Sequence, residues 1–157
     1  MRNTGFVRID TAGVVGLGTM GAGIAEVFGR AGLQVVAVEV DEPLVAAGRA
    51  RIEASLDRAV GRGRLEAAER DAILGRTTFT SDRGALAAAD LVVEAVPERL
   101  DVKAALFDEL DRICAPTAIL ATNTSSLPVT QIAAATGRPG RLVGMHFFNP
   151  APVMRLV

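Results

Sequence analysis

The sequence has few of the residues that build disulfides and metal centres. Its single cysteine, Cys114, excludes an internal disulfide and any cysteine-based zinc site, and it fits a reducing, cytoplasmic compartment. We interpret Cys114 as a small core side chain rather than a reactive thiol. We predict no metal site.

The sequence also lacks an excess of either charge. Its 17 basic residues face 18 acidic ones, so the formal net charge is −1 and no sustained basic field is available for a nucleic-acid backbone. Nucleic acid is therefore not an expected partner. Lys103 is the only lysine, and every other basic residue is arginine. From the residue pattern alone, Lys103 is an ordinary residue of a helix surface.

Long hydrophobic runs are missing as well. The chain is 50% hydrophobic and 22% charged, which is typical of a globular protein in water and predicts no association with a membrane. Residues 1–10 show no pattern of a secretion signal. The length of 157 residues suits one domain, which we place at residues 1–157.

Short apolar runs alternate with helical patterns along the chain. Helical spacing over residues 42–74, broken by Gly61 and Gly63, predicts a helical hairpin. The alternation as a whole predicts a Rossmann-type, doubly wound α/β fold with a mostly parallel sheet and this hairpin inserted. Strands are expected at 11–16, 34–40, 77–80, 90–96, 118–121 and 141–148, and the clearest helices at 20–30, 99–113 and 129–135.

Three glycines follow the first predicted strand in the pattern GLGTMG. Gly16 permits a tight turn, Gly18 lets the backbone approach a pyrophosphate, and Gly21 allows close packing of helix on strand. The amide groups at the helix start then face the phosphates. The alternative is a glycine-rich turn without a ligand, but the flanking strand and helix favour dinucleotide binding. The predicted cofactor residues here are Gly16, Leu17, Gly18, Thr19, Met20 and Gly21.

An acidic residue closes the second predicted strand. Glu39 stands about 20 residues after the glycine turn, where a carboxylate binds the ribose hydroxyls of NAD and repels the 2′-phosphate of NADP. We therefore predict NAD rather than NADP. Asp41 remains an alternative ribose contact, because one sequence does not fix a strand end to within two residues.

Two later segments, ATNTSSLPVT at 121–130 and GMHFFNPAPVMRLV at 144–157, go beyond a generic nucleotide-binding fold. Together with GLGTMGAGIA and DLVVEAVPE, they resemble the NAD-binding domain of the 3-hydroxyacyl-CoA dehydrogenases, which include 3-hydroxybutyryl-CoA dehydrogenases. The resemblance covers essentially the whole chain. It implies an enzyme of fatty acid metabolism and β-oxidation that interconverts (3S)-3-hydroxyacyl-CoA and 3-oxoacyl-CoA.

The resemblance also implies roles for single residues. His146, the only histidine, is expected at a strand end as the group that takes the hydroxyl proton while hydride leaves for the nicotinamide. Ser125 is expected to bind the substrate oxygen close to the nicotinamide. Further residues match family positions that bind the cofactor (Glu98, Lys103, Asn149) or CoA (Ser55, Arg62). Without the resemblance, Ser125 and Asn149 are interpreted as turn residues.

In the family, a glutamate that orients the histidine follows the segment matched by HFFNP, at the position directly after Val157. The family also has a helical C-terminal domain, which closes the substrate cleft and supplies most of the contact in a homodimer; it is absent from this sequence. Losing such an orienting carboxylate costs on the order of 10⁴ in rate in a serine-protease triad. We therefore expect NAD binding with little or no turnover.

Two other functions remain open at this point. A stand-alone NAD-binding module with a regulatory role needs only the glycine turn and Glu39. A relative of the 3-hydroxyisobutyrate dehydrogenases also carries GLGxMG, but its catalytic lysine lies in a later helix that has no counterpart here.

Overall fold

The computed structural model describes residues 8–157. Most of the N-terminal segment in which we predict no secretion signal lies outside this part. Six strands form one sheet in the order β3-β2-β1-β4-β5-β6, and each neighbouring pair is parallel. The strands are β1 (Thr11–Val15), β2 (Gln34–Val38), β3 (Thr77–Thr80), β4 (Leu91–Glu94), β5 (Ile119–Thr122) and β6 (Leu142–Gly144). The predicted doubly wound fold is confirmed, with a fully parallel sheet.

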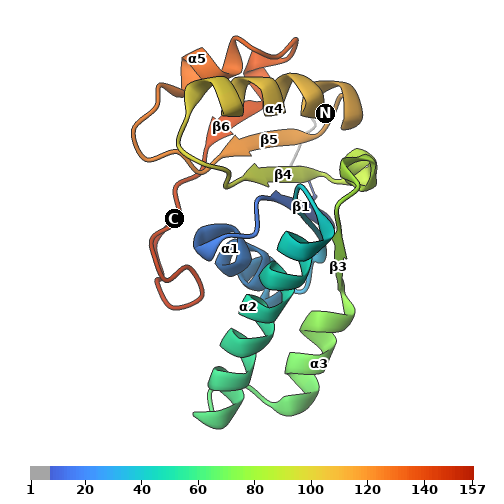
Figure 1. Ribbon diagram of the computed structural model, residues 1–157, viewed down its shortest axis with the longest axis vertical. Coiled ribbons are helices and arrows are strands. Elements are labelled where there is room, and N and C mark those ends of the chain that lie inside the picture. Colours follow the sequence, from blue (N-terminus) through green and yellow to red (C-terminus); the bar gives the residue numbers. More distant parts are fainter. Residues whose placement is uncertain (1–7) are drawn as a thin grey trace, which may run out of the picture.

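Helices cover both faces of this sheet (Figure 1). Helix α1 (Thr19–Arg30) covers one face, and its buried residues join those of β1 and β2 in one core cluster. Helices α4 (Leu100–Ile113) and α5 (Val129–Ala133) cover the other face, together with the 3-10 helix η1 (Arg83–Ala88). Successive residues of a strand point to opposite faces. Val14 accordingly packs with α1, while Val15 packs with α4.

The predicted helical hairpin is present and extends away from the sheet (Figure 1). It consists of α2 (Glu42–Gly61) and α3 (Ala67–Gly75), and the turn between them contains Gly63 with a φ of 64°. Ile52 and Leu56 of α2 are fully buried against the core on the side of α1. The hairpin therefore has a fixed place beside α1.

Four predicted strands end earlier than expected. The first ends at Val15 rather than residue 16, the second at Val38 rather than residue 40, the fourth at Glu94 rather than residue 96, and the last at Gly144 rather than residue 148. The last ladder bond of β6 runs from the Met145 amide to Thr122 O, after which the Phe147 amide donates to the side chain of Asn123 instead (2.8 Å). A short 3-10 helix, η2 (Pro139–Arg141), precedes β6. Within residues 8–157, no helix has the length and apolarity needed to cross a membrane.

Candidate functional site

A crevice opens at the carboxyl ends of β1 and β4, where the strand order reverses. Parallel α/β sheets bind their ligands at this switch point. The crevice is a cavity of about 740 Å³. Its walls include five of the predicted cofactor residues: Gly16, Gly18, Thr19, Met20 and Glu39. Leu17 is fully buried, and its amide donates a hydrogen bond to Glu39.

Two of the three glycines of the turn are required by the geometry of the turn itself. Gly16 has a φ of 89°, which L side chains rarely adopt, and a Cβ at Gly21 would lie 1.7 Å from Gly16 O. Gly18 is different, because a Cβ there would meet nothing within 4 Å. Gly18 is also the N-cap of α1 and supplies no side-chain cap, so the first amides of α1 are left for a ligand. This cradle fits the pyrophosphate of a dinucleotide.

Glu39 and Asp41, the two candidate ribose contacts, have separate places in the structure. Glu39 lies on the crevice wall, and its Oε1 accepts a hydrogen bond from the Leu17 amide of the glycine turn (2.6 Å). Asp41 instead caps α2 by accepting a hydrogen bond from the Leu44 amide (2.8 Å). The geometry therefore favours Glu39 as the residue that faces a ribose, and its contact with the cofactor stays a prediction.

The loop that follows β5 carries Ser125 and is held by Glu98. Oε1 of Glu98 accepts hydrogen bonds from the hydroxyl of Thr124 and from the amides of Ser125 (3.0 Å) and Ser126 (3.3 Å). Partial burial raises the pKa of Glu98, but these hydrogen bonds and the ammonium of Lys103 outweigh burial and lower that pKa to about 2. Ser125 itself is exposed on the loop. Glu98 thus fixes the backbone of the loop through direct hydrogen bonds.

Lys103 does not lie on a helix surface, as the residue pattern alone suggested. Its side chain is 1% exposed, and Nζ lies 2.5 Å from Oε1 of Glu94 and 3.2 Å from Oε2 of Glu98. Glu94, at the end of β4, is fully buried and was not singled out from the sequence. The local signal for Glu94 is that one acidic residue interrupts the apolar run DLVVEAV, but its contact with Lys103 depends on the fold. Binding of the cofactor by Lys103 stays a prediction.

His146 lies two residues beyond β6, on the segment that Asn123 ties to the loop after β5. Thr122 of β5 pairs with Gly144 of β6, so the segments that carry Ser125 and His146 start side by side. The imidazole is exposed and contacts the ring of Phe148 edge to face, with centroids 5.1 Å apart. In the part of the chain that the structure describes, no hydrogen bond or ion pair holds its ring nitrogens. Its orientation therefore depends on packing alone.

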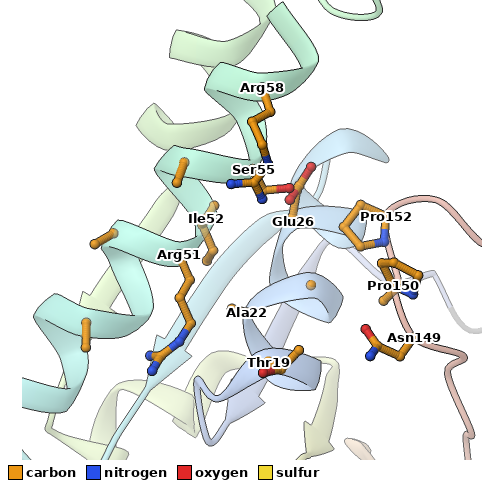
Figure 2. Close-up of a pocket in the computed structure, with 15 residues that line it drawn as sticks. Thr19, Ala22, Glu26, Arg51, Ile52, Ser55, Arg58, Asn149, Pro150 and Pro152 are labelled. Atoms are coloured by element: carbon orange, nitrogen blue, oxygen red, sulfur yellow. The ribbon is translucent and has the colours of Figure 1, made fainter. Parts of the chain in front are cut away.

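A groove runs along the other side of α1, between α2 and the C-terminal segment (Figure 2). Its inner half is a cavity of about 660 Å³, lined by Thr19 of α1, Arg51 of α2 and Asn149 of the C-terminal segment. Most other side chains of this inner half are alanine, isoleucine or proline. Asn149, expected to bind the cofactor, thus lies on this groove, and its cofactor role stays a prediction.

The outer half of the groove is rich in arginine. This cavity of about 510 Å³ shares Ser55 and Arg58 with the inner half and ends near Arg62. Glu26 is its one acidic residue: it is 1% exposed, it pairs with Arg30, and its Oε2 has no partner among the described residues. Four of the arginines form no ion pair within residues 8–157. They give this end a positive charge and are Arg58, Arg62, Arg64 and Arg155.

The expected CoA residues, Ser55 and Arg62, therefore lie on one groove, and Figure 2 shows Ser55 and Arg58 of α2 pointing toward Glu26 of α1.

Cys114 is buried, and burial raises the pKa of its thiol, as expected for a core side chain. Sequence reasoning missed Glu94, Asn123 and Glu26. Asn123 bonds to a residue distant in sequence, and the importance of Glu94 and Glu26 comes from their burial, which the sequence pattern does not report.

Comparison with known proteins matches residues 11–157 to the family model described as 3-hydroxyacyl-CoA dehydrogenase, NAD binding domain. The chain is 53% identical over 150 residues to a 3-hydroxybutyryl-CoA dehydrogenase of Mycobacterium tuberculosis, covering 95% of this chain and 52% of that protein. It is 48% identical over 152 residues to a 3-hydroxyadipyl-CoA dehydrogenase of Escherichia coli, covering 97% and 32%. This chain spans about half the length of the first relative and a third of the second.

Among solved structures, the crystal structure of M. tuberculosis FadB2 superposes with a TM-score of 0.92 at 52% identity, covering 93% of this chain and 52% of that one. The predicted resemblance and the NAD cofactor are thereby confirmed at the level of the family.

Proposed function

The chain belongs to the family of NAD-binding domains of 3-hydroxyacyl-CoA dehydrogenases, and from this we propose that it serves the interconversion of (3S)-3-hydroxyacyl-CoA and 3-oxoacyl-CoA. The observation that carries the proposal is the pairing of two sites along α1. A glycine-lined crevice with Glu39 suits a dinucleotide, and a groove with four arginines that form no ion pair within residues 8–157 suits the phosphates of CoA. Thr19 lies on both walls.

The residues of this chain divide the work. The first amides of α1 bind the pyrophosphate, and Glu39 binds the adenosine ribose. When bound, NAD supplies the acceptor for the hydride. His146 accepts the hydroxyl proton during oxidation and returns it during reduction. Ser125, held by Glu98, donates a hydrogen bond to the substrate oxygen, and Ser55 and Arg62 bind CoA.

Oxidation of NADH by acetoacetyl-CoA tests this function. Because the M. tuberculosis relative is about twice as long, the assay compares the chain alone with the chain joined to the remaining part of that relative. We expect little turnover from the chain alone and clear turnover from the joined protein. His146→Ala should abolish turnover while NADH binding is retained.

Each part of the proposal has its own contrary result. Full activity without His146 would overturn its role. NADH binding without turnover in the joined protein would favour an NAD-binding module. The same proposal includes a cytoplasmic location, a place in β-oxidation and a homodimeric parent enzyme. The mass of the joined protein, measured by sedimentation, tests whether it forms a homodimer.

A further inference from the structure

Glu94 is the centre of a buried polar network under the loop that carries Ser125. Its Oε1 accepts hydrogen bonds from Nζ of Lys103 (2.5 Å) and from the Val96 amide (2.8 Å), and its Oε2 accepts one from the Thr122 hydroxyl (2.8 Å). These partners belong to α4, to the turn after β4 and to the end of β5. One fully buried carboxylate thus joins three segments at the edge of the crevice.

The network continues from Glu94 to the loop through two charges. Nζ of Lys103 lies between Glu94 and Glu98, and Glu98 in turn accepts the hydrogen bonds that shape residues 124–126. Lys103 is 1% exposed, whereas the side chain of Glu98 is 39% exposed. Glu94 is therefore the counter-charge that lies at the same depth as the ammonium, and a buried cation needs a close counter-charge.

We propose that Glu94 is a positioning residue for the cofactor and substrate site: it holds Lys103 in place so that Lys103 fixes Glu98 and Glu98 fixes the loop of Ser125. This inference rests on the proposed function for the purpose of the loop. The contacts themselves require no ligand. Because Glu94 is fully buried, its effect on the site travels through Lys103.

The variant Glu94→Gln keeps the size of the side chain and removes its charge. Two outcomes of opposite sign follow for the pKa of Glu98, which the titration of its side-chain carboxyl carbon measures by NMR. If Lys103 leaves its place, Glu98 loses a favourable cation and its pKa rises. If Lys103 stays in place, Glu98 only loses a negative neighbour, and its pKa falls.

We expect the pKa of Glu98 to rise in Glu94→Gln. We also expect the amides of Ser125 and Ser126 to exchange with solvent about tenfold faster, the effect of weakening one charge-assisted hydrogen bond. NADH should bind more weakly to the same variant. A pKa of Glu98 that falls or stays unchanged, or loop amides that exchange as in the wild type, would overturn the proposal.

Two further variants separate positioning from general loss of stability. Asp111 lies on α4, the helix that also carries Lys103, and pairs with Arg138. The variant Asp111→Asn removes this carboxylate and should leave the loop amides and the pKa of Glu98 unchanged. The double variant E94Q/K103M leaves no buried charge unpaired and so remains testable if Glu94→Gln does not fold. It should show the raised pKa of Glu98 and the faster exchange. Wild-type behaviour of the double variant would overturn the proposal.

These readouts also separate this inference from the proposed function. Titration and amide exchange are measured without any ligand. If the wild-type chain does not bind NADH, the proposed function fails, while the response of Glu98 and the loop amides still decides the role of Glu94.

Discussion

Substitution of Gly18 by alanine should separate cofactor binding from folding. Gly18 has a φ of −63° and a ψ of −166°, a conformation open to any residue, and a Cβ there would meet nothing within 4 Å. Gly→Ala at a compatible position restricts the unfolded chain and stabilises a protein by about 0.4–1 kcal/mol. The free energy of unfolding of Gly18→Ala should therefore stay unchanged or rise slightly.

Binding of NADH should respond in the opposite direction. Gly18 lines the crevice in which the proposed function places the pyrophosphate, so a methyl group there would take up space that the phosphates need. A misfit of this kind costs about 1–3 kcal/mol, which corresponds to roughly a 5- to 150-fold higher Kd. Titration of NADH fluorescence gives the Kd, and urea denaturation gives the free energy of unfolding.

Gly21→Ala is the contrasting variant in the same turn. Its Cβ would lie 1.7 Å from Gly16 O, so the backbone of α1 must move, and we expect a loss of at least about 1–3 kcal/mol in folding stability. The reasoning fails if Gly18→Ala binds NADH as tightly as the wild type. Equal losses of folding stability in the two variants would also refute it, because they would mean that a side chain at Gly18 has no open space.

Three other expectations follow from single contacts. Glu39→Ala should weaken NAD binding, whereas Asp41→Ala should lower the free energy of unfolding by about 1 kcal/mol through loss of the α2 cap and leave NAD affinity nearly unchanged; calorimetric titration and urea melts check both. Because the folded pKa of Glu98 is lowered to about 2 from 4.5, its stabilising contribution is full above pH 4.5 and is lost as pH falls from there toward 2. Acid unfolding of wild type and Glu98→Gln tests this, and parallel stability curves through that range would contradict it. Cys114 should react with iodoacetamide only after unfolding, since its thiol is buried and its pKa is raised, and modification of the native protein at the rate of a free thiol would refute that.

The sheet and its order of elements could be predicted because the relevant signals are local. Apolar runs, the spacing of α2 and α3, and the glycine turn each depend on neighbours within a few residues. The strand ends could not be predicted to the residue. The expected last strand included His146, but the ladder stops at Gly144 because the side chain of Asn123 competes for the next amide of the segment. Nothing in a periodic pattern reports such a competition.

The buried charges escaped prediction for another reason. A lysine in a helix is exposed by default, and only a buried counter-charge reverses this expectation. Glu94 and Lys103 meet because the turn after β4 brings α4 back over the strand end, which is a property of the fold rather than of the spacing. The same holds for Glu26, whose depth depends on the hairpin packing against α1.

Charge gives the two sites of the proposed function a means to tell their ligands apart. NAD and CoA both contain an adenosine diphosphate, so the glycine turn alone does not discriminate between them. The crevice has the carboxylate of Glu39 on its wall, which would repel a phosphorylated ribose, and the ribose of CoA carries a phosphate. The outer groove has the opposite balance: among the described residues, four of its arginines form no ion pair, and Glu26, the acid that lines it, is paired to Arg30. Because α1 separates the crevice from the groove and Thr19 lines both, the proposed function places NAD beside a carboxylate and the phosphates of CoA beside arginines, on opposite sides of one helix.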